Sequence, residues 1–187
     1  MEDKVKQLAF YDGLTGLANR RLLDDRLGQS MLAGKRSGRH SALLFLDLDN
    51  FKPLNDSHGH SAGDLLLVEV ANRLKTCVRQ TDTVARFGGD EFVVLLSELT
   101  ADRGTSTIEA ARVAEKIRST LAAPYVLELG SADGPAPRTT EHQCSASIGV
   151  AVFGAHETTA EEAMRWADKA MYDAKVLGRN RVCIFGN

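Results

Sequence analysis

Two clusters of acidic residues could do chemistry in this chain. Asp47 and Asp49 stand at the end of a short apolar run, and Asp90 and Glu91 directly follow a pair of glycines. Carboxylate oxygens are the ligands that hard divalent cations such as Mg²⁺ prefer in proteins. An acid at the end of a buried strand is costly unless its charge meets a partner. Together the two clusters predict a site for divalent cations.

The first cluster is positioned by residues 41–46, which are almost wholly apolar and predict a buried central strand. Side chains alternate along a strand, so Asp47 and Asp49 should point the same way, with the Leu48 carbonyl between them. An alternative interpretation is that these acids cap the next helix. That role suits Asp49 or Asn50, and it suits Asp47 much less.

The second cluster lies at a predicted hairpin. Gly88 and Gly89 separate two strand-like runs, and both positions of a Gly-Gly turn tolerate positive φ. Asp90 and Glu91 would then lie at the exposed tip, where two negative charges gain nothing from the fold. The alternative is an ordinary turn with solubilising acids. The acids at the end of the preceding strand favour the metal site over that alternative.

Helices and strands alternate along the chain. Apolar residues at helical spacing predict helices near residues 23–31, 61–78, 110–121 and 159–174, the last opened by a capping box and ended at Gly178. Strands are expected at 41–48, on both sides of the hairpin glycines, at 143–153 and at 181–185. The stretch 127–143 is rich in Gly and Pro and predicts a flexible tip remote from the chemistry. This order predicts an α/β (α+β) sandwich, with helices packed on a mostly antiparallel sheet.

Composition limits the class of protein. At 187 residues, 43% hydrophobic and 26% charged, the chain is an ordinary globular sequence long enough for one domain. The net charge of −2 argues against a nucleic-acid binder, which would show a basic face. Cys77, Cys144 and Cys183 are isolated, and we expect reduced core residues in a cytoplasmic protein. No apolar run reaches membrane-spanning length and no signal peptide is recognisable, so we expect no membrane contact by this segment.

Several motifs follow one another in a recognisable order. They are the segment 12–21, the run Asp47-Leu-Asp-Asn-Phe-Lys52, the pair Asn55-Asp56, the run Gly59-His-Ser-Ala-Gly-Asp64, the run Gly88-Gly-Asp-Glu-Phe92, and the closing segments 147–151 and 167–180. On these motifs the chain resembles the GGDEF family of diguanylate cyclases, from about residue 5 to its C-terminus. The resemblance implies the palm-like βαββαβ core of nucleotidyl cyclases. It also implies that the chain condenses two GTP into cyclic di-GMP, with release of two pyrophosphates.

In this setting the acids acquire expected roles. Asp47, the Leu48 carbonyl and Asp90 are the expected Mg²⁺ ligands. Glu91 is expected either to bind a second metal or to accept the proton from the attacking 3′-hydroxyl, and the sequence leaves both roles open. Asp90 and Glu91 are thus the expected catalytic acids. We expect two Mg²⁺ ions per site, about 3.5–4 Å apart, for which Mn²⁺ can substitute.

Basic residues near the C-terminus are expected to bind the GTP phosphates. Lys175 and Arg179 are four residues apart, so both lie on one helix face and can reach the terminal phosphates together. The alternative is a solvated basic last turn that is favoured by the helix dipole. Only the surrounding motif favours phosphate binding.

Residues on both sides of the acids are expected to complete the phosphate cradle. A helix start offers free N–H groups, so the backbone amides of Asn50 and Phe51 and the side chain of Lys52 are expected to contribute. Gly88 and Gly89 are also expected to contact GTP.

Base recognition is expected from Asn55 and Asp64. A carboxylate can accept two hydrogen bonds from guanine N1–H and the 2-amino group, and adenine lacks both donors on that edge. An acceptor left unpaired costs about 1–3 kcal/mol, which would discriminate against ATP. Asp64 could instead be an acid at a helix N-terminus. The family motif favours guanine.

Regulation and assembly are implied by the resemblance. Arg79 and Asp82 form an RxxD pattern five residues before Gly88, which in this family is an inhibitory site for the product. Arg can bind guanine O6 and N7, and Asp can accept the N1 and N2 protons. One site binds one GTP, so a homodimer in which two domains face each other is expected to be the active form.

Residues 1–11 are expected to be the end of a helix entering the domain, and residues 12–187 the GGDEF catalytic domain. A catalytic domain without a sensing region is unusual for the family, so we expect a larger signalling protein, which could be membrane-anchored. The main alternative is a catalytically inactive GGDEF module that senses GTP or cyclic di-GMP, although all the expected catalytic residues are present. A structural dimerisation domain would leave the acidic strand end unexplained. A cyclase making a different cyclic dinucleotide depends on whether Asp64 reads guanine.

Overall fold

The computed structural model describes residues 9–58, 60–130, 138–154, 156 and 158–186. A five-stranded sheet has the order β2-β3-β1-β6-β7, and only the β6–β7 pairing is parallel. Its strands are β1 (Ser41–Leu48), β2 (Thr83–Gly88), β3 (Glu91–Leu96), β6 (Ala146–Phe153) and β7 (Val182–Ile184). The predicted mostly antiparallel sheet flanked by helices is confirmed. The predicted helix entering the domain at residues 1–11 falls mainly outside the described residues.

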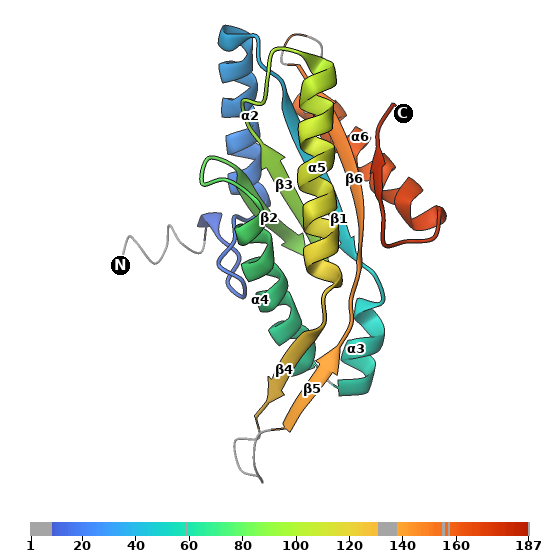
Figure 1. The fold of residues 1–187 in the computed structure, drawn as a ribbon. Helices are drawn as coiled ribbons and strands as arrows, with labels where there is room; N and C mark the ends of the chain where they lie inside the picture. The colour runs from blue at the N-terminus through green and yellow to red at the C-terminus, as the bar shows by residue number, and fades with distance from the viewer. Residues whose placement is uncertain (1–8, 59, 131–137, 155, 157, 187) are drawn as a thin grey trace.

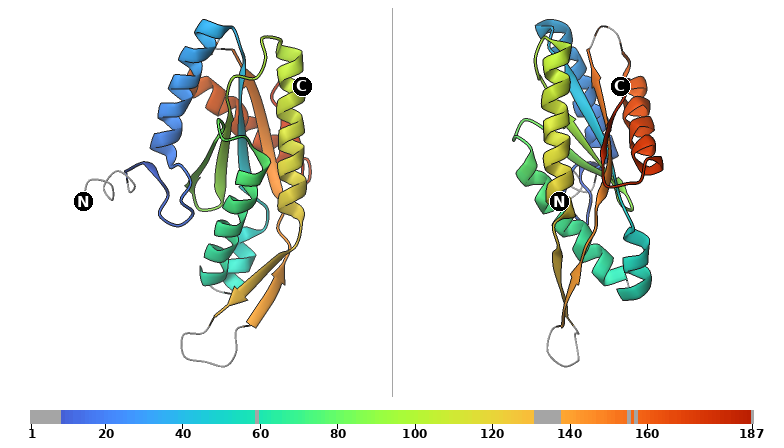
Figure 2. Two further views of the ribbon diagram at one scale, coloured as in Figure 1. Left: turned by 60° about the vertical axis from the view of Figure 1, so that its left-hand side comes forward. Right: turned by 45° about the vertical axis from the view of Figure 1, so that its right-hand side comes forward.

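Helices cover both faces of this sheet (Figures 1 and 2). Helices α4 (His60–Cys77) and α5 (Arg103–Ala122) pack on one face, and α2 (Arg20–Ser37) and α6 (Ala160–Val176) on the other. In β1, Leu44 and Leu46 join the cluster beneath α4 and α5, while Leu43 and Phe45 join the cluster beneath α2 and α6. A strand covered on both sides has no polar face, which explains the continuous apolar run in the sequence.

Helix α6 lies very close to β6. A Cβ on Gly149 would stand 2.1 Å from the Met171 backbone nitrogen and 2.2 Å from the Ala167 carbonyl oxygen, so only glycine fits there. The predicted capping box at the start of α6 is present, with Thr159 and Glu162 each accepting from the other's backbone N–H. The close approach at Gly149 sets the position of α6 on β6, the strand that pairs with β1.

The predicted hairpin joins β2 to β3, and its two glycines have φ of 139° and 52°. The prediction of a flexible tip at residues 127–143 is wrong for its ends. Strands β4 (Tyr125–Leu129) and β5 (Arg138–His142) pair as an antiparallel arm that extends beyond the sheet (Figure 1). The strand predicted at 143–153 accordingly begins only at Ala146.

A short helix, α3 (Phe51–His58), follows β1 directly and packs beside α4. All three cysteines are free thiols, as predicted, but only Cys77 and Cys144 are buried in the core, and Cys183 is partly exposed. Among the described residues, no helix combines the length and apolar character needed to cross a bilayer.

Candidate active site

The structure brings the two acidic clusters together. Asp47, near the end of β1, pairs with Glu91 at the start of β3, and the Leu48 N–H donates to the Asp90 carbonyl oxygen at 3.2 Å. The antiparallel β1–β3 register therefore sets the strand end beside the hairpin turn. Lys175, in the last turn of α6, reaches the same place and forms an ion pair with the Asp47 carboxylate.

Crowding of these carboxylates changes their acidity. Burial, followed by the nearby charge of Asp47, raises the pKa of Asp90 to about 6. Burial also raises the pKa of Glu91, and the charges of Asp47 and Asp168 add to the effect. Lys175 opposes both shifts because its ammonium group favours the ionised carboxylates. The site thus concentrates negative charge that one lysine only partly neutralises.

The donor set suits a hard cation. The neighbouring carboxylates of Asp47 and Asp90 offer only oxygen ligands, as Mg²⁺ and Mn²⁺ prefer. The mutual repulsion of Asp47 and Asp90 is the kind of strain that a divalent cation relieves. Within the described part of the chain, however, no three Asp, Glu, His or Cys side chains form a complete metal-binding group.

Asp49 has surroundings quite unlike those of Asp47. Its carboxylate is buried and accepts hydrogen bonds from Ser145 Oγ at 2.7 Å, Ser147 Oγ at 2.7 Å and the Asn180 backbone N–H at 3.0 Å. The sequence analysis missed this serine pair. Ser145 lies just before β6 and Ser147 lies within it, and their spacing of two residues places both side chains on one face. Nothing in the sequence paired them with Asp49.

Arg86, which the sequence analysis also missed, forms hydrogen bonds to the hairpin turn. Its guanidinium donates to the Gly89 carbonyl oxygen at 2.9 and 3.1 Å and forms an ion pair with Asp12 at 3.1 Å. Asp12 in turn accepts from the Thr15 backbone N–H at 2.9 Å. The opening segment of the chain is therefore connected directly to the carbonyl that precedes Asp90.

The predicted GTP-binding residues come from several different elements. Asn50 has a left-handed backbone with φ 58° immediately before α3, and Lys52 is exposed on the first turn of that helix. Asp64 is exposed on α4, and Arg179 is exposed in the turn after α6. Asn55 is in α3, but its side chain is outside the described part of the structure. Phe51 is the first residue of α3, and Gly88 and Gly89 are exposed at the turn.

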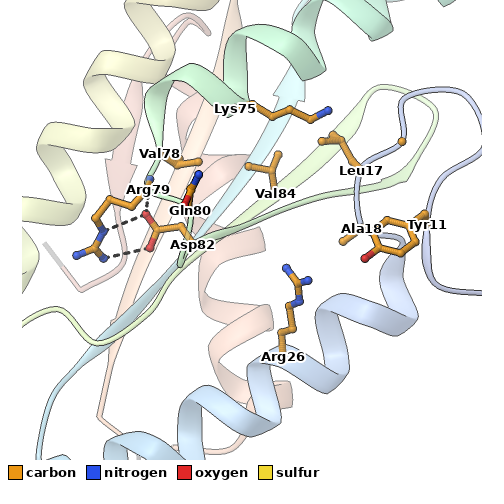
Figure 3. Close-up of a pocket in the computed structure, with 11 residues that line it drawn as sticks. Tyr11, Leu17, Ala18, Arg26, Lys75, Val78, Arg79, Gln80, Asp82 and Val84 are labelled. Carbon is orange, nitrogen blue, oxygen red and sulfur yellow. Dashed lines mark hydrogen bonds and ion pairs between the residues drawn. The ribbon is translucent and has the colours of Figure 1, made fainter. Parts of the chain in front are cut away.

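The predicted inhibitory pair is preformed. Arg79 donates to Asp82 through Nε at 3.2 Å and Nη2 at 3.1 Å, and Asp82 is almost fully buried (Figure 3). Beside them is a cavity of about 300 Å³ between α2, the end of α4 and the edge of β2. Tyr11, Arg26 and Lys75 are among the side chains that line it (Figure 3).

Comparison with known proteins identifies the family and the fold. The pattern of the family described as "Diguanylate cyclase, GGDEF domain" matches residues 9–181. The chain therefore belongs to the GGDEF family, as its motifs predicted. Curated relatives include proteins named diguanylate cyclase, so the chain is a GGDEF domain of the diguanylate cyclase family in cyclic di-GMP signalling.

Individual relatives agree over nearly the whole chain. The bifunctional diguanylate cyclase/cyclic di-GMP phosphodiesterase MucR of Pseudomonas aeruginosa is 45% identical over 96% of this chain and 24% of MucR. The crystal structure of the GGDEF domain of TpbB from the same species has a TM-score of 0.80 at 36% identity, covering 92% of this chain and 99% of that one. The coiled coil and GGDEF domain of DgcB from Caulobacter crescentus, in complex with c-di-GMP, has a TM-score of 0.82 at 30% identity, covering 98% and 89%. The chain spans about a quarter of MucR, whose name covers two opposing activities.

Proposed function

We propose that this chain is an active diguanylate cyclase, which condenses two GTP molecules into cyclic di-GMP and releases two pyrophosphates. The observation that carries the proposal is the position of Asp47 beside Asp90 and opposite Glu91, with Lys175 at the same point. A GGDEF domain that kept only a structural role would gain nothing from gathering three acids there.

Each residue has a role in the proposed reaction. The 3′-oxygen of one GTP attacks the α-phosphorus of the other, the bond to the bridging oxygen breaks, and pyrophosphate leaves. Asp47, the Leu48 carbonyl and Asp90 would hold Mg²⁺, and Glu91 would either hold a second ion or accept the 3′-hydroxyl proton. The bound cation would neutralise charge on the triphosphate and its leaving group. Glu91 lies opposite Asp47 in the β1–β3 register, which supports a place for its carboxylate at the reacting centre in either role.

Lys175 and Arg179 are proposed to bind the terminal phosphates, and Asn50, Phe51 and Lys52 to contribute at the start of α3. The ion pair between Lys175 and Asp47 supports this role for the lysine, since it shows that the ammonium group reaches the acids. In the substrate complex a cation between the acids would release Lys175 toward the triphosphate. Gly88 and Gly89, which have no Cβ, would let the phosphates approach the turn closely.

Guanine recognition is proposed for Asn55 and Asp64, and product binding for Arg79 and Asp82. The c-di-GMP complex of DgcB supports nucleotide binding by domains of this fold. The position of Arg79 and Asp82 at the wall of a cavity supports the inhibitory site, and the Arg79 guanidinium is exposed enough to meet a guanine. Turnover is proposed to require a homodimer in which two GTP-loaded domains face each other.

The test is incubation of the purified chain with GTP and Mg²⁺, followed by chromatographic identification of the product. Wild type should form cyclic di-GMP, and Glu91→Gln should form at least about a hundredfold less, as expected for loss of a general base. A version fused to a dimerising helix removes weak association as a cause of failure. If that version binds GTP but forms no product, the alternative of an inactive sensor for GTP or cyclic di-GMP replaces this proposal.

A further inference from the structure

The two aspartates of the Asp-x-Asp pair are not equivalent in this structure. Asp47 faces Asp90 and Lys175, whereas the Asp49 carboxylate accepts three hydrogen bonds. One oxygen of Asp49 accepts from both Ser145 and the Asn180 backbone N–H, so both of its lone pairs are used. A carboxylate in that state has little capacity left to bind a cation.

The Asn180 N–H, which donates to Asp49, belongs to the turn after α6. Gly178, Arg179 and Asn180 have φ of 118°, 63° and 45°, three left-handed residues in succession, of which two are not glycine. Left-handed non-glycine residues are costly and persist only where neighbouring groups hold them. Asn180 is held twice, by the bond from its N–H to Asp49 and by the Arg118 guanidinium, which donates to its Oδ1 at 2.8 Å.

Arg179 lies in the middle of this held turn. Its own N–H donates to the Ala174 carbonyl oxygen at 3.0 Å, which fixes the turn to the end of α6. The side chain of Arg179 is exposed, so the backbone sets the direction in which its guanidinium leaves the turn. The bond from Asn180 to Asp49 connects that backbone to the end of β1, two residues beyond Asp47.

We propose that Asp49 is a positioning residue, which holds the 178–180 turn so that Arg179 points at the terminal phosphates of GTP. This inference rests on the proposed function, since it assumes that the chain binds GTP through Arg179. This role needs Asp49 only as a hydrogen-bond acceptor for the Asn180 N–H, and it needs no negative charge at position 49. An asparagine at position 49 can supply that acceptor through its Oδ1 and can donate its amide N–H to a serine hydroxyl.

The experiment measures the dissociation constant of GTP with Mg²⁺ for four proteins: wild type, Asp49→Asn, Asp49→Ala and Arg179→Ala. We expect Asp49→Asn to stay within about threefold of wild type, and Asp49→Ala to weaken binding by about tenfold, the usual scale for one hydrogen bond to a charged group. Binding of GMP, which has no terminal phosphates, should be equal in all four. The Mg²⁺ concentration for half-maximal GTP binding should be unchanged in Asp49→Asn.

A double variant separates positioning from a general structural role. If Asp49 acts through Arg179, adding Asp49→Ala to Arg179→Ala should weaken GTP binding by less than about threefold further. A fully additive loss, an equal loss for GMP, or a raised Mg²⁺ requirement in Asp49→Asn would overturn the inference. If Asp49→Ala does not fold, Asp49→Leu with Ser145→Ala and Ser147→Ala replaces the polar group by apolar side chains, with the same expected losses. Wild type that binds no GTP would refute the proposed function itself, whereas wild type that binds with Asp49→Ala unaffected would refute only this inference.

Discussion

The substitution Asp90→Asn should stabilise the folded protein in the absence of divalent cations. Burial and the charge of Asp47 raise the pKa of Asp90 from its ordinary value of 3.8 to about 6. A difference of one in pKa corresponds to about 1.4 kcal/mol, so the ionised form of Asp90 costs the folded state at most about 3 kcal/mol. Because Asp90 keeps partial contact with water, we expect about 1–2 kcal/mol. Asparagine keeps the shape and removes the charge.

The sign of the pH dependence follows from the direction of the shift. Folded Asp90 holds its proton more tightly than unfolded Asp90, so wild type loses stability as the pH rises from about 4 through about 6. The advantage of Asp90→Asn should therefore be largest above pH 7, about half as large at pH 5, and close to zero near pH 4. Lys175 favours the ionised form of Asp90, and its effect is already included in the net rise of the Asp90 pKa on which the expected difference rests.

Urea unfolding with EDTA at pH 8 and pH 5 measures this difference. At pH 8 thermal unfolding should shift upward by about 2–4 °C for each kcal/mol. Asp24→Asn, which removes an exposed acid from α2, is the matched control and should change little. Equal stability of wild type and Asp90→Asn at pH 8, or an advantage that grows as the pH falls, would refute the assignment of strain to Asp90.

Three further substitutions test other parts of the structure. Arg79→Ala should raise the cyclic di-GMP concentration needed for half-inhibition while turnover without product persists, and an unchanged dose–response curve would count against the RxxD site. Gly149→Ala should destabilise the fold by at least about 2 kcal/mol in chemical unfolding, because its Cβ would meet the α6 backbone at 2.1 Å, whereas Gly28→Ala, with open space around it, should be neutral or stabilising. Tyr125→Phe removes a buried hydroxyl that has no hydrogen-bond partner among the described residues, so thermal melting should show a change between zero and about 1 kcal/mol of stabilisation; a clear loss of stability would show that the hydroxyl is satisfied.

The elements that sequence predicted well are those whose signal is local. The apolar run of β1, the Gly-Gly turn and the capping box at Thr159 each depend on residues within one strand, turn or helix end. Strand β5 carries no such signal, because it is Arg-Thr-Thr-Glu-His, almost entirely polar, and follows a stretch of glycine and proline. Strand β4, Tyr-Val-Leu-Glu-Leu, has apolar residues at strand spacing, but the glycines and prolines after it favoured a flexible tip from residue 127. Both segments are strands because they pair with each other, and pairing across an intervening segment cannot be read from periodicity.

The same limit applies to the candidate site. The acids were recognisable because their residue types and positions are unusual, but the groups that hold them are distant in the sequence. Arg86 meets Asp12 across 74 residues, and Asn180 meets Asp49 across 131. An arginine before a turn or an asparagine after a helix is ordinary by itself, so only the folded chain distinguishes these partners from solvated side chains.

The contrast between Asp49 and Asp90 indicates which acids can respond to a cation. The Asp49 carboxylate accepts three hydrogen bonds, and removing one of the donors would destabilise the folded protein. Asp90 faces another carboxylate, so positive charge nearby would stabilise its ionised form. A cation that binds the folded state alone stabilises it by about 2.7 kcal/mol at a hundred times its dissociation constant. Mg²⁺ should therefore stabilise wild type at pH 8 and have little effect on Asp90→Asn, so the two melting curves should converge as Mg²⁺ is added. Melting curves that keep the same separation would mean that the cation binds elsewhere, and that it does not relieve the unfavourable charge of Asp90.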